Sequence, residues 1–449
     1  MRAVWRAPFR SLILRAVMGD ERAPAARDEL GGGAKAVYAL GDLTTNTAIS
    51  ALTLVYASYF LTQVAGLRGA LAGLVPLVAR GLDAFADPLM GRLTDATTWR
   101  AGRRRPYFLL GALPFGVGFA ALWWTPPVES QAGLFAYYTV AYILVSLAMT
   151  VLSVPYLALI PEMALGYDAR TSLNTYRSAG AILGTLAAIG IRPLADAFGG
   201  GAQGFVSAGA LYGAALAAPW LLVHRVSFER PAFRTRGAEA DWRAALRAVL
   251  GHRTFTQLTS LYIFGRIAMD LVGALVILYV THWIGRSGDF EKVMGVFLGC
   301  VLLALPFWLR LARRYDKAVV FVAGSLLWAA VSLFALSFGP ETPRAVIYVW
   351  AAAAAVGYAV VDIMPWAMVG DAIDEDDLAH GERREGLYNG VFTFLRKLGG
   401  AVGVFLVLSL LDLAGFQKVA EGESQPEAAR QAIRWLTGLS PCLFLLLGV

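Results

Sequence analysis

Two aspartates one helical turn apart, Asp83 and Asp87, lie within an apolar stretch of the sequence. At helical spacing, Arg80 falls on the same face. Ionisable side chains at membrane depth cost a few kcal/mol each, so they normally face a cavity and mark the path of an ion or a substrate. Two carboxylates held close together stay ionised only with a cation or a proton between them. The pair therefore predicts a site for a coupling ion.

A sodium ion bound by this pair needs further oxygen ligands. Thr150, in another apolar stretch, carries a hydroxyl that can supply one, so Asp83, Asp87 and Thr150 form the predicted cation site. No organic cofactor is expected, and the predicted ion is Na⁺, with Li⁺ or H⁺ as alternatives. The alternative is that the aspartates stabilise the fold and bind no ion, because either one could pair with Arg80 or Arg177 to hold helices together.

Two basic residues, Arg177 and Lys397, lie inside apolar stretches further along the chain. In a central cavity they could neutralise the aspartate pair or hold polar or anionic parts of a substrate. The alternative is that their side chains reach to the membrane surface. Asp362 has no oppositely charged residue nearby on its own helix, and Lys397 on a neighbouring helix is its predicted partner. Arg266 and Asp270 are four residues apart, so a local ion pair explains them equally well.

The composition indicates an integral membrane protein. The chain has 449 residues, of which 57% are hydrophobic and 16% are charged, whereas soluble domains have about 25% charged residues. The net charge of +7 comes from Lys and Arg residues clustered in loops, which indicates membrane orientation rather than nucleic-acid binding. The expected fold is all-α with twelve transmembrane helices, from apolar runs at 41–63, 69–91, 106–125, 134–160, 172–197, 204–224, 255–283, 291–312, 318–339, 345–370, 387–412 and 433–449.

The longest polar connection lies in the middle of the chain and predicts two six-helix halves. The loops richest in Lys and Arg are expected to be cytoplasmic, which places both termini inside. The protein is expected to lie in the cell membrane as a monomer. The last run has no polar tail, so the natural C-terminus is expected to extend beyond Val449. The predicted parts are a leader (1–35), an N-terminal half (36–224), a linker with an amphipathic helix (225–254) and a C-terminal half (255–449).

Weak internal repeats support the duplication. The segment SVPYLALIPE in the fourth run is similar to DIMPWAMVGD in the tenth, which aligns Tyr156 with Trp366. RSAGAILG in the fifth run is similar to RKLGGAVG in the eleventh. Charged loops at matching places in both halves predict salt bridges that close a cytoplasmic gate, formed by Asp95, Arg103, Glu162, Arg170, Arg313, Asp316, Asp371, Asp374 and Arg383.

Several segments together resemble one known family. They are DAFADPLMG followed by GRRRPY, VPYLALIPE, YDARTSLNTYR and DAIDEDDLAHGERREGLYNGVFTFLRKLGG. These segments are similar to motifs of the glycoside–pentoside–hexuronide:cation symporters of the major facilitator superfamily, which are related to sodium-coupled lysolipid symporters. The resemblance implies a fold of two pseudo-symmetric halves. It also implies cation ligands at Asp83, Asp87 and Thr150, and the family's helix-five arginine and helix-eleven lysine at Arg177 and Lys397.

The first and fourth helices depart from the melibiose permease, a member of that family. Where the permease uses an aspartate on its first helix, this chain has Thr47 beside Asn46, and Ser153 stands in place of an aspartate on the fourth. Loss of two carboxylates removes the strongest hydrogen-bond acceptors of a sugar site, so a lysolipid is as open a choice as a glycoside. The residues predicted to have substrate or coupling roles are Arg177, Lys397, Asn46, Thr47, Ser153, Tyr156, Asp362 and Trp366.

The whole sequence predicts a secondary active transporter and not an enzyme. The expected activity is cation-coupled symport of a glycoside-like or lysolipid solute across the lipid bilayer by alternating access. An uncoupled facilitator would share this architecture and lack ion coupling. A membrane enzyme of lipid metabolism would need a catalytic cluster at one membrane face, for which DAIDEDD at 371–377 is the acidic run available.

Overall fold

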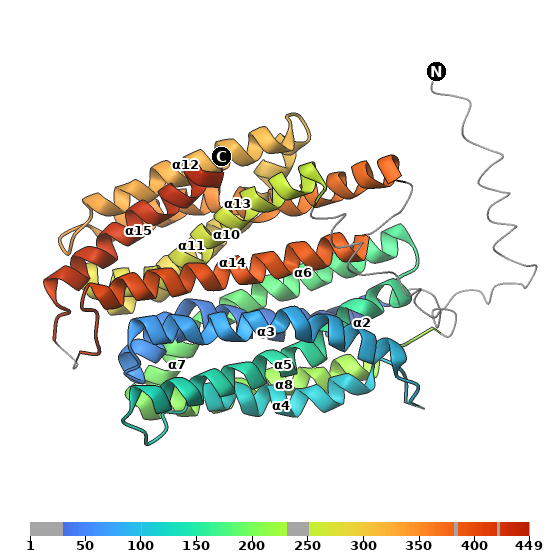
Figure 1. Ribbon diagram of the computed structural model, residues 1–449, viewed down its shortest axis with the longest axis horizontal. Helices are drawn as coiled ribbons and strands as arrows, with labels where there is room; N and C mark the ends of the chain where they lie inside the picture. Colours follow the sequence, from blue (N-terminus) through green and yellow to red (C-terminus); the bar gives the residue numbers. More distant parts are fainter. Residues whose placement is uncertain (1–29, 100, 231–250, 381–384, 420–422, 449) are drawn as a thin grey trace, which may run out of the picture.

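The computed structural model describes residues 30–99, 101–230, 251–380, 385–419 and 423–448, and every element within them is helical (Figure 1). Eleven of these helices are long and apolar enough to cross a membrane, and one shorter apolar helix joins them. The predicted all-α fold with twelve spans is confirmed. The elements of the first part are α2 (Gly32–Ala51), η1 (Leu52–Val64), α3 (Gly69–Ala96), α4 (Pro106–Leu122), α5 (Gln131–Met163), α6 (Tyr167–Ile189), α7 (Ile191–Ala197) and α8 (Gly201–Val226).

The second part begins after the linker, most of which (231–250) lies outside the described residues, as does the leader up to residue 29. The π-helical η1 and η3 continue the first helix of each part, α2 and α10. The elements of this part are α10 (Arg253–Leu278), η3 (Tyr279–Trp283), η4 (Ser287–Asp289), α11 (Phe290–Ala312), α12 (Lys317–Leu333), η5 (Phe334–Ser337), α13 (Arg344–His380), α14 (Glu385–Leu413) and α15 (Glu427–Gly448).

Most helix boundaries shift by a few residues from those read off the sequence, and two differences concern the predicted organisation. The first helix begins at Gly32, inside the predicted leader. The fifth apolar run is not one helix, because α6 ends at Ile189 and α7 begins at Ile191. Pro193 explains the break, since a proline has no N–H to continue the ladder to the carbonyl of Ile189.

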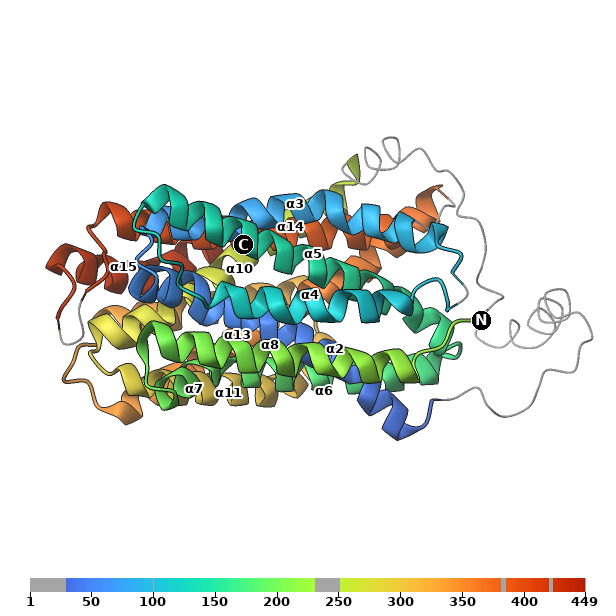
Figure 2. The same ribbon diagram turned by 90° about the horizontal axis from the view of Figure 1, so that it is seen from below.

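The helices form two groups that lie side by side along the long axis of the molecule (Figure 1). In the first group α2 packs on α6, α4 on α8, and α5 on both α3 and α4. In the second, α13 packs on α11 and α12, while α10 packs on α14 and α15. The groups meet chiefly where α14 lies along α3 and where α10 lies along η1 (Figure 2).

Glycines allow the closest helix contact within the first group. An added Cβ at Gly184 of α6 would overlap the backbone carbonyl of Leu43 in α2, and one at Gly180 would overlap that of Ala39. The neighbouring atoms are backbone, so they cannot move aside as a flexible side chain would.

Gly184→Ala is expected to lower the melting temperature by several degrees, because α2 and α6 must separate or shift to admit the methyl group. Gly295→Ala in α11 is the matched control, since an added Cβ there meets no atom within 4 Å. Circular dichroism melts of the purified variants measure both. Equal melting temperatures would contradict the close α2–α6 contact.

Polar contacts between described residues join the two groups at one end of the bundle. We call the end with the 97–105 loop, between α3 and α4, the arginine end. At the opposite end several polar contacts join the groups. They are Gln63 Nε2 to Gln417 O (3.2 Å), Lys418 Nζ to Val64 O (2.7 Å), Arg192 Nη1 to Ser287 O (3.1 Å) and the pair Arg68–Asp412 (3.9 Å).

Candidate functional site

The predicted cation-site residues lie together between α3 and α5. The hydroxyl of Thr150 donates to Oδ1 of Asp87 at 2.7 Å, and the hydroxyl of Ser146 donates to Oδ1 of Asp83 at 2.6 Å. Nη1 of Arg80 lies 3.3 Å from Oδ2 of Asp83. Asp83 is buried, with 3% of its side chain exposed, whereas Asp87 is 32% exposed. Asp83 thus anchors the site, and Asp87 is its more accessible member.

Lys397 brings a positive charge to this site from the other group of helices. Its Nζ lies 2.6 Å from Oδ2 of Asp87 and 3.7 Å from Oδ2 of Asp83. One ammonium thus lies against both carboxylates, where two like charges need a cation between them. Lys397 thus neutralises the aspartate pair, which is one of its two predicted roles, and its predicted pairing with Asp362 is not found. Asp362 lies instead 4.0 Å from Arg266, and half of its side chain is exposed.

Helical periodicity explains why these groups meet. Asp83 and Asp87 share one face of α3, and Ser146 and Thr150, also four residues apart, share the facing side of α5. Each carboxylate therefore accepts a hydrogen bond from one hydroxyl of α5. Ser146 was missed in the sequence, although its spacing from Thr150 repeats the spacing of the aspartates.

Arg177 has a partner that the sequence analysis also missed. Its Nε and Nη2 donate to the two carboxylate oxygens of Asp42 at 2.7 and 3.0 Å, and its guanidinium lies over the ring of Tyr156. The Tyr156 hydroxyl donates to Asp42 at 2.5 Å, and the Tyr38 hydroxyl donates to the Tyr156 carbonyl at 2.6 Å. These contacts tie α2, α5 and α6 together, apart from the cation site.

The remaining predicted substrate residues lie at several places. The Asn46 amide donates to the Asp42 carbonyl at 2.8 Å, and the buried Thr47 donates its hydroxyl to the Leu43 carbonyl at 2.8 Å. Trp366 of α13 lies edge-on against Phe392 of α14, and Ser153 is half-buried in α5. The structure therefore brings Tyr156 and Arg177 together, and leaves Ser153 and Trp366 on separate helices.

Breaking the Asp42–Arg177 pair is expected to destabilise the protein. Both side chains are 16% exposed, and removing one partner of a mostly buried pair costs on the order of 3 kcal/mol. Asp42→Asn and Arg177→Gln should each lower the melting temperature, and the double variant should lose less than the two losses added together. Strictly additive losses would mean that Arg177 acts independently of Asp42.

At the arginine end, the predicted gate residues of the first group pair among themselves. Glu162 accepts from Arg103 at 2.8 Å and from Arg104 at 2.5 Å, and Arg104 also pairs with Asp95 at 2.9 Å. Arg170 donates to the carbonyl of Ala164. These bonds hold the α3–α4 loop against the end of α5.

The gate residues of the second group have separate contacts. Asp371 of α13 pairs with Lys317 at 2.5 Å, and Asp316 caps α12 by accepting from the Ala318 N–H at 2.7 Å. Arg313 caps the C-terminal end of α11, and Asp374 lies further along α13. Arg383 lies outside the described residues. Each of these pairs joins residues of one group, so the predicted bridges between the halves stay a prediction.

A carboxylate just after α8 also holds the α3–α4 loop. Glu229 accepts from the backbone N–H groups of Arg103, Arg104 and Arg105 at 2.7, 2.8 and 3.0 Å. Burial alone would raise the pKa of Glu229, but these N–H donors and the Arg103 guanidinium lower that pKa below its ordinary value. Glu229 is thus held as a carboxylate that fixes the start of the linker to this loop.

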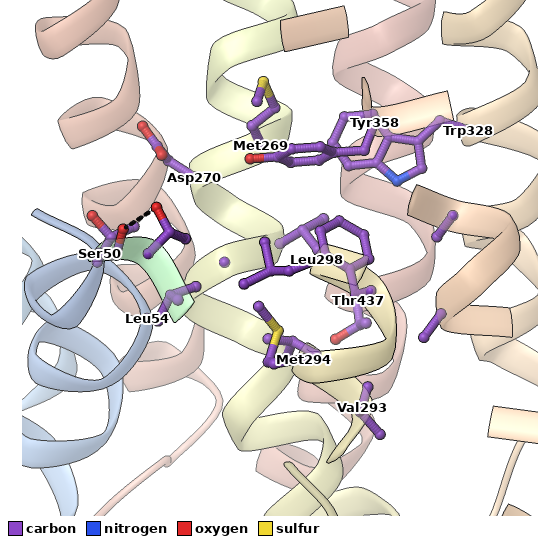
Figure 3. A pocket seen from close by; sticks show the side chains of 18 of the residues that line it. Ser50, Leu54, Met269, Asp270, Val293, Met294, Leu298, Trp328, Tyr358 and Thr437 are labelled. Atoms are coloured by element: carbon purple, nitrogen blue, oxygen red, sulfur yellow. Dashed lines mark hydrogen bonds between the residues drawn. The ribbon is translucent and has the colours of Figure 1, made fainter. Parts of the chain in front are cut away.

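A mostly apolar cavity lies between the two groups of helices and is lined chiefly by residues of the second group. Met269, Met294, Leu298 and Trp328 surround it (Figure 3). Its polar rim faces the first group, where the Ser50 hydroxyl donates to Thr185 at 3.3 Å. A concave apolar space with a few polar groups at one side is the usual form of a small-molecule site.

An all-helical membrane bundle with ion pairs buried between two helix groups defines a membrane transporter of the major facilitator type. The family model described as MFS/sugar transport protein matches residues 37–449, so the chain belongs to this family. It is a multi-pass membrane transporter and not an enzyme.

Curated relatives cover nearly the whole chain. An uncharacterized symporter of Synechocystis sp. is 29% identical (92% of this chain, 92% of the relative). The sodium-dependent lysophosphatidylcholine symporter 1 of Mus musculus is 25% identical (96% and 86%). The putative glycoside/cation symporter YagG of Escherichia coli is 28% identical (90% and 87%). Among solved structures, a D-xylose–proton symporter shares the fold with a TM-score of 0.66 at 16% identity (92% and 96%).

Proposed function

We propose that the protein is a sodium-coupled symporter, with the ion bound between Asp83 and Asp87. The observation that supports this most is that two carboxylates of α3, each accepting from a hydroxyl of α5, lie against one ammonium, Lys397, from the other helix group. These oxygens are ligands that a hard cation prefers. Li⁺ or H⁺ are the alternative ions.

Coupling follows from competition at this site. A sodium ion that binds Asp83 and Asp87 must displace the ammonium of Lys397, which lies 2.6 Å from Asp87. Because α3 and α14 belong to different groups, that exchange changes the free energy of their contact. A ligand shifts a conformational equilibrium by its difference in affinity for the two states, so the ion favours one arrangement of the halves.

The favoured solute is amphipathic, similar to a lysolipid. The cavity lined by Met269, Met294, Leu298 and Trp328 presents an apolar surface to a hydrocarbon chain, and Arg177, predicted to hold a sugar or an anion, is already bound to Asp42. The name of the mouse relative agrees with this choice. A glycoside is the second candidate, favoured by the name of the relative YagG.

The polar contacts that join the groups at the end opposite the arginine end support alternating access. They support a state closed on that side. The positive-inside rule assigns the arginine end, and both termini, to the cytoplasm. The proposed state therefore faces the cytoplasm.

Thermal stability of the purified protein in lipid nanodiscs tests the proposal. At equal ionic strength, NaCl should raise the melting temperature relative to choline chloride, and lysophosphatidylcholine should add a further increase that depends on Na⁺. A ligand at about 100 times its Kd stabilises by about 2.7 kcal/mol. Equal melting temperatures in the two salts at every pH would overturn ion coupling, and a cooperative effect of a glycoside instead would overturn the lysolipid.

A further inference from the structure

The ion pair Arg266–Asp270 of α10 lies between two cavities. The apolar cavity described above is lined on one side by both residues. A second, smaller cavity contains the charged groups of Arg80 and Lys397 and is lined by the same two residues. The pair therefore separates the space proposed for the solute from the space around the cation site.

The carboxylate of Asp270 lies close to Lys397. Gly400 follows Lys397 by three residues on α14, so both lie on one face of that helix. An added Cβ at Gly400 would overlap the Asp270 carboxylate, which therefore rests against α14 one turn from Lys397. Among the residues that line the smaller cavity together with Lys397, Asp270 is the one with a carboxylate.

Arg266 is at present bound to Asp270. Its Nε donates to Oδ2 of Asp270 at 2.8 Å, and Nη2 forms a second bond to Oδ1. Asp362, at 4.0 Å, adds a weaker contact. Of the described residues that line the apolar cavity, Arg266 is the basic one. A guanidinium at the rim of an apolar space is suited to bidentate binding of an oxyanion.

We propose that the Arg266–Asp270 pair couples ion binding at Asp83 and Asp87 to solute binding in the apolar cavity. This inference rests on the proposed function above. When the coupling ion occupies Asp83 and Asp87, the ammonium of Lys397 moves to Asp270. Asp270 then releases Arg266, whose guanidinium binds an oxyanion of the solute. The solute is accordingly a single-chain amphiphile with a phosphate or carboxylate group, and its chain fills the apolar cavity.

The free-energy cost of an unpaired buried ammonium explains why Lys397 must exchange one carboxylate for another. An ammonium displaced from Asp87 without a new partner would be a buried unpaired charge, which is strongly unfavourable. Asp270 removes that cost only by giving up its bonds to Arg266, which in turn requires the solute oxyanion. Ion and solute therefore each make the binding of the other more favourable, and by equal factors.

Two matched probes test the proposal in nanodiscs: a lysophosphatidate and the monoacylglycerol with the same acyl chain. Wild type should bind the lysophosphatidate at least about tenfold more tightly in Na⁺ than in choline, and bind the monoacylglycerol weakly in both.

In Asp270→Asn, lysophosphatidate affinity should differ less than about twofold between the salts, because Arg266 is always free. In Arg266→Gln, stabilisation by Na⁺ alone should persist while the preference for the phosphate is lost. Asp289→Asn, which removes a carboxylate paired with Arg344 in the same half, is the control and should behave as wild type.

The outcomes separate this inference from the proposed function. If Na⁺ does not stabilise wild type, sodium coupling is overturned, and the inference with it. If Na⁺ stabilises wild type but Asp270→Asn keeps the tenfold dependence on Na⁺, only the role of the pair is overturned. Equal binding of the two probes by wild type would overturn the requirement for an oxyanion. If Asp270→Asn does not fold, Arg266→Gln still tests the inference. Loss of its stabilisation by Na⁺ would contradict the proposal that ion binding precedes the release of Arg266.

Discussion

Asp87→Asn is expected to abolish Na⁺-driven uptake, with a loss of about 100-fold or more, while the protein still folds and inserts. The amide keeps the shape of the side chain but removes the charge that holds both Lys397 and the proposed ion. Asp87 is 32% exposed, so water offsets part of the lost pairing and the melting temperature in choline should fall little. Uptake of labelled lysophosphatidylcholine into proteoliposomes with an imposed Na⁺ gradient measures the effect.

Asp83→Asn is the informative comparison. Asp83 is 3% exposed and pairs with Arg80, so its loss leaves a buried guanidinium without its closest carboxylate, at a cost on the order of 3 kcal/mol. This variant should lose both uptake and thermal stability, whereas Asp87→Asn loses mainly uptake. Normal Na⁺-driven accumulation by both variants would rule out the aspartate pair as the ion site.

The grouping proposed as the cation site was partly predictable from the sequence, because the spacing of its two aspartates is local. Asp83 and Asp87 follow from two charges at helical spacing inside an apolar run, and Thr150 follows from a hydroxyl inside another run. Ser146 was equally available by that rule, being one turn before Thr150, but a serine in a membrane helix usually bonds its own backbone. Its role depends on the register of α5 against α3, which sequence spacing within one helix does not determine.

Partners on distant helices were only partly predictable, because Lys397 beside the aspartate pair was one of several alternatives and Asp42 beside Arg177 was not foreseen. Lys397 reaches Asp87 across 310 residues of sequence, and Asp42 binds Arg177 across 135. Several basic and acidic residues lie in apolar runs, so composition allows many pairings and only the packing of α14 on α3 and of α2 on α6 selects these. The apolar cavity was missed for the same reason, because its lining comes from several different helices.

Lys397→Gln is expected to tighten Na⁺ binding by about tenfold, or about 1.4 kcal/mol. The ammonium lies where the ion is proposed to bind, 2.6 Å from Asp87 and 3.7 Å from Asp83, so it competes with the ion in wild type. Without it, two neighbouring carboxylates repel each other until Na⁺ arrives. The melting temperature should therefore fall in choline and rise more steeply with added NaCl than in wild type.

Tighter ion binding should not give faster transport in this variant. Lys397 is the group that neutralises Asp87 when the ion has left, so its loss makes the return of the ion-free carrier costly and net uptake should fall. Lys397→Arg is the matched control, because it keeps the charge and should keep the Na⁺ affinity of wild type within a few-fold. An unchanged Na⁺ affinity in Lys397→Gln would show that the ammonium and the ion do not compete, and the exchange between α14 and α3 could then not be the source of coupling.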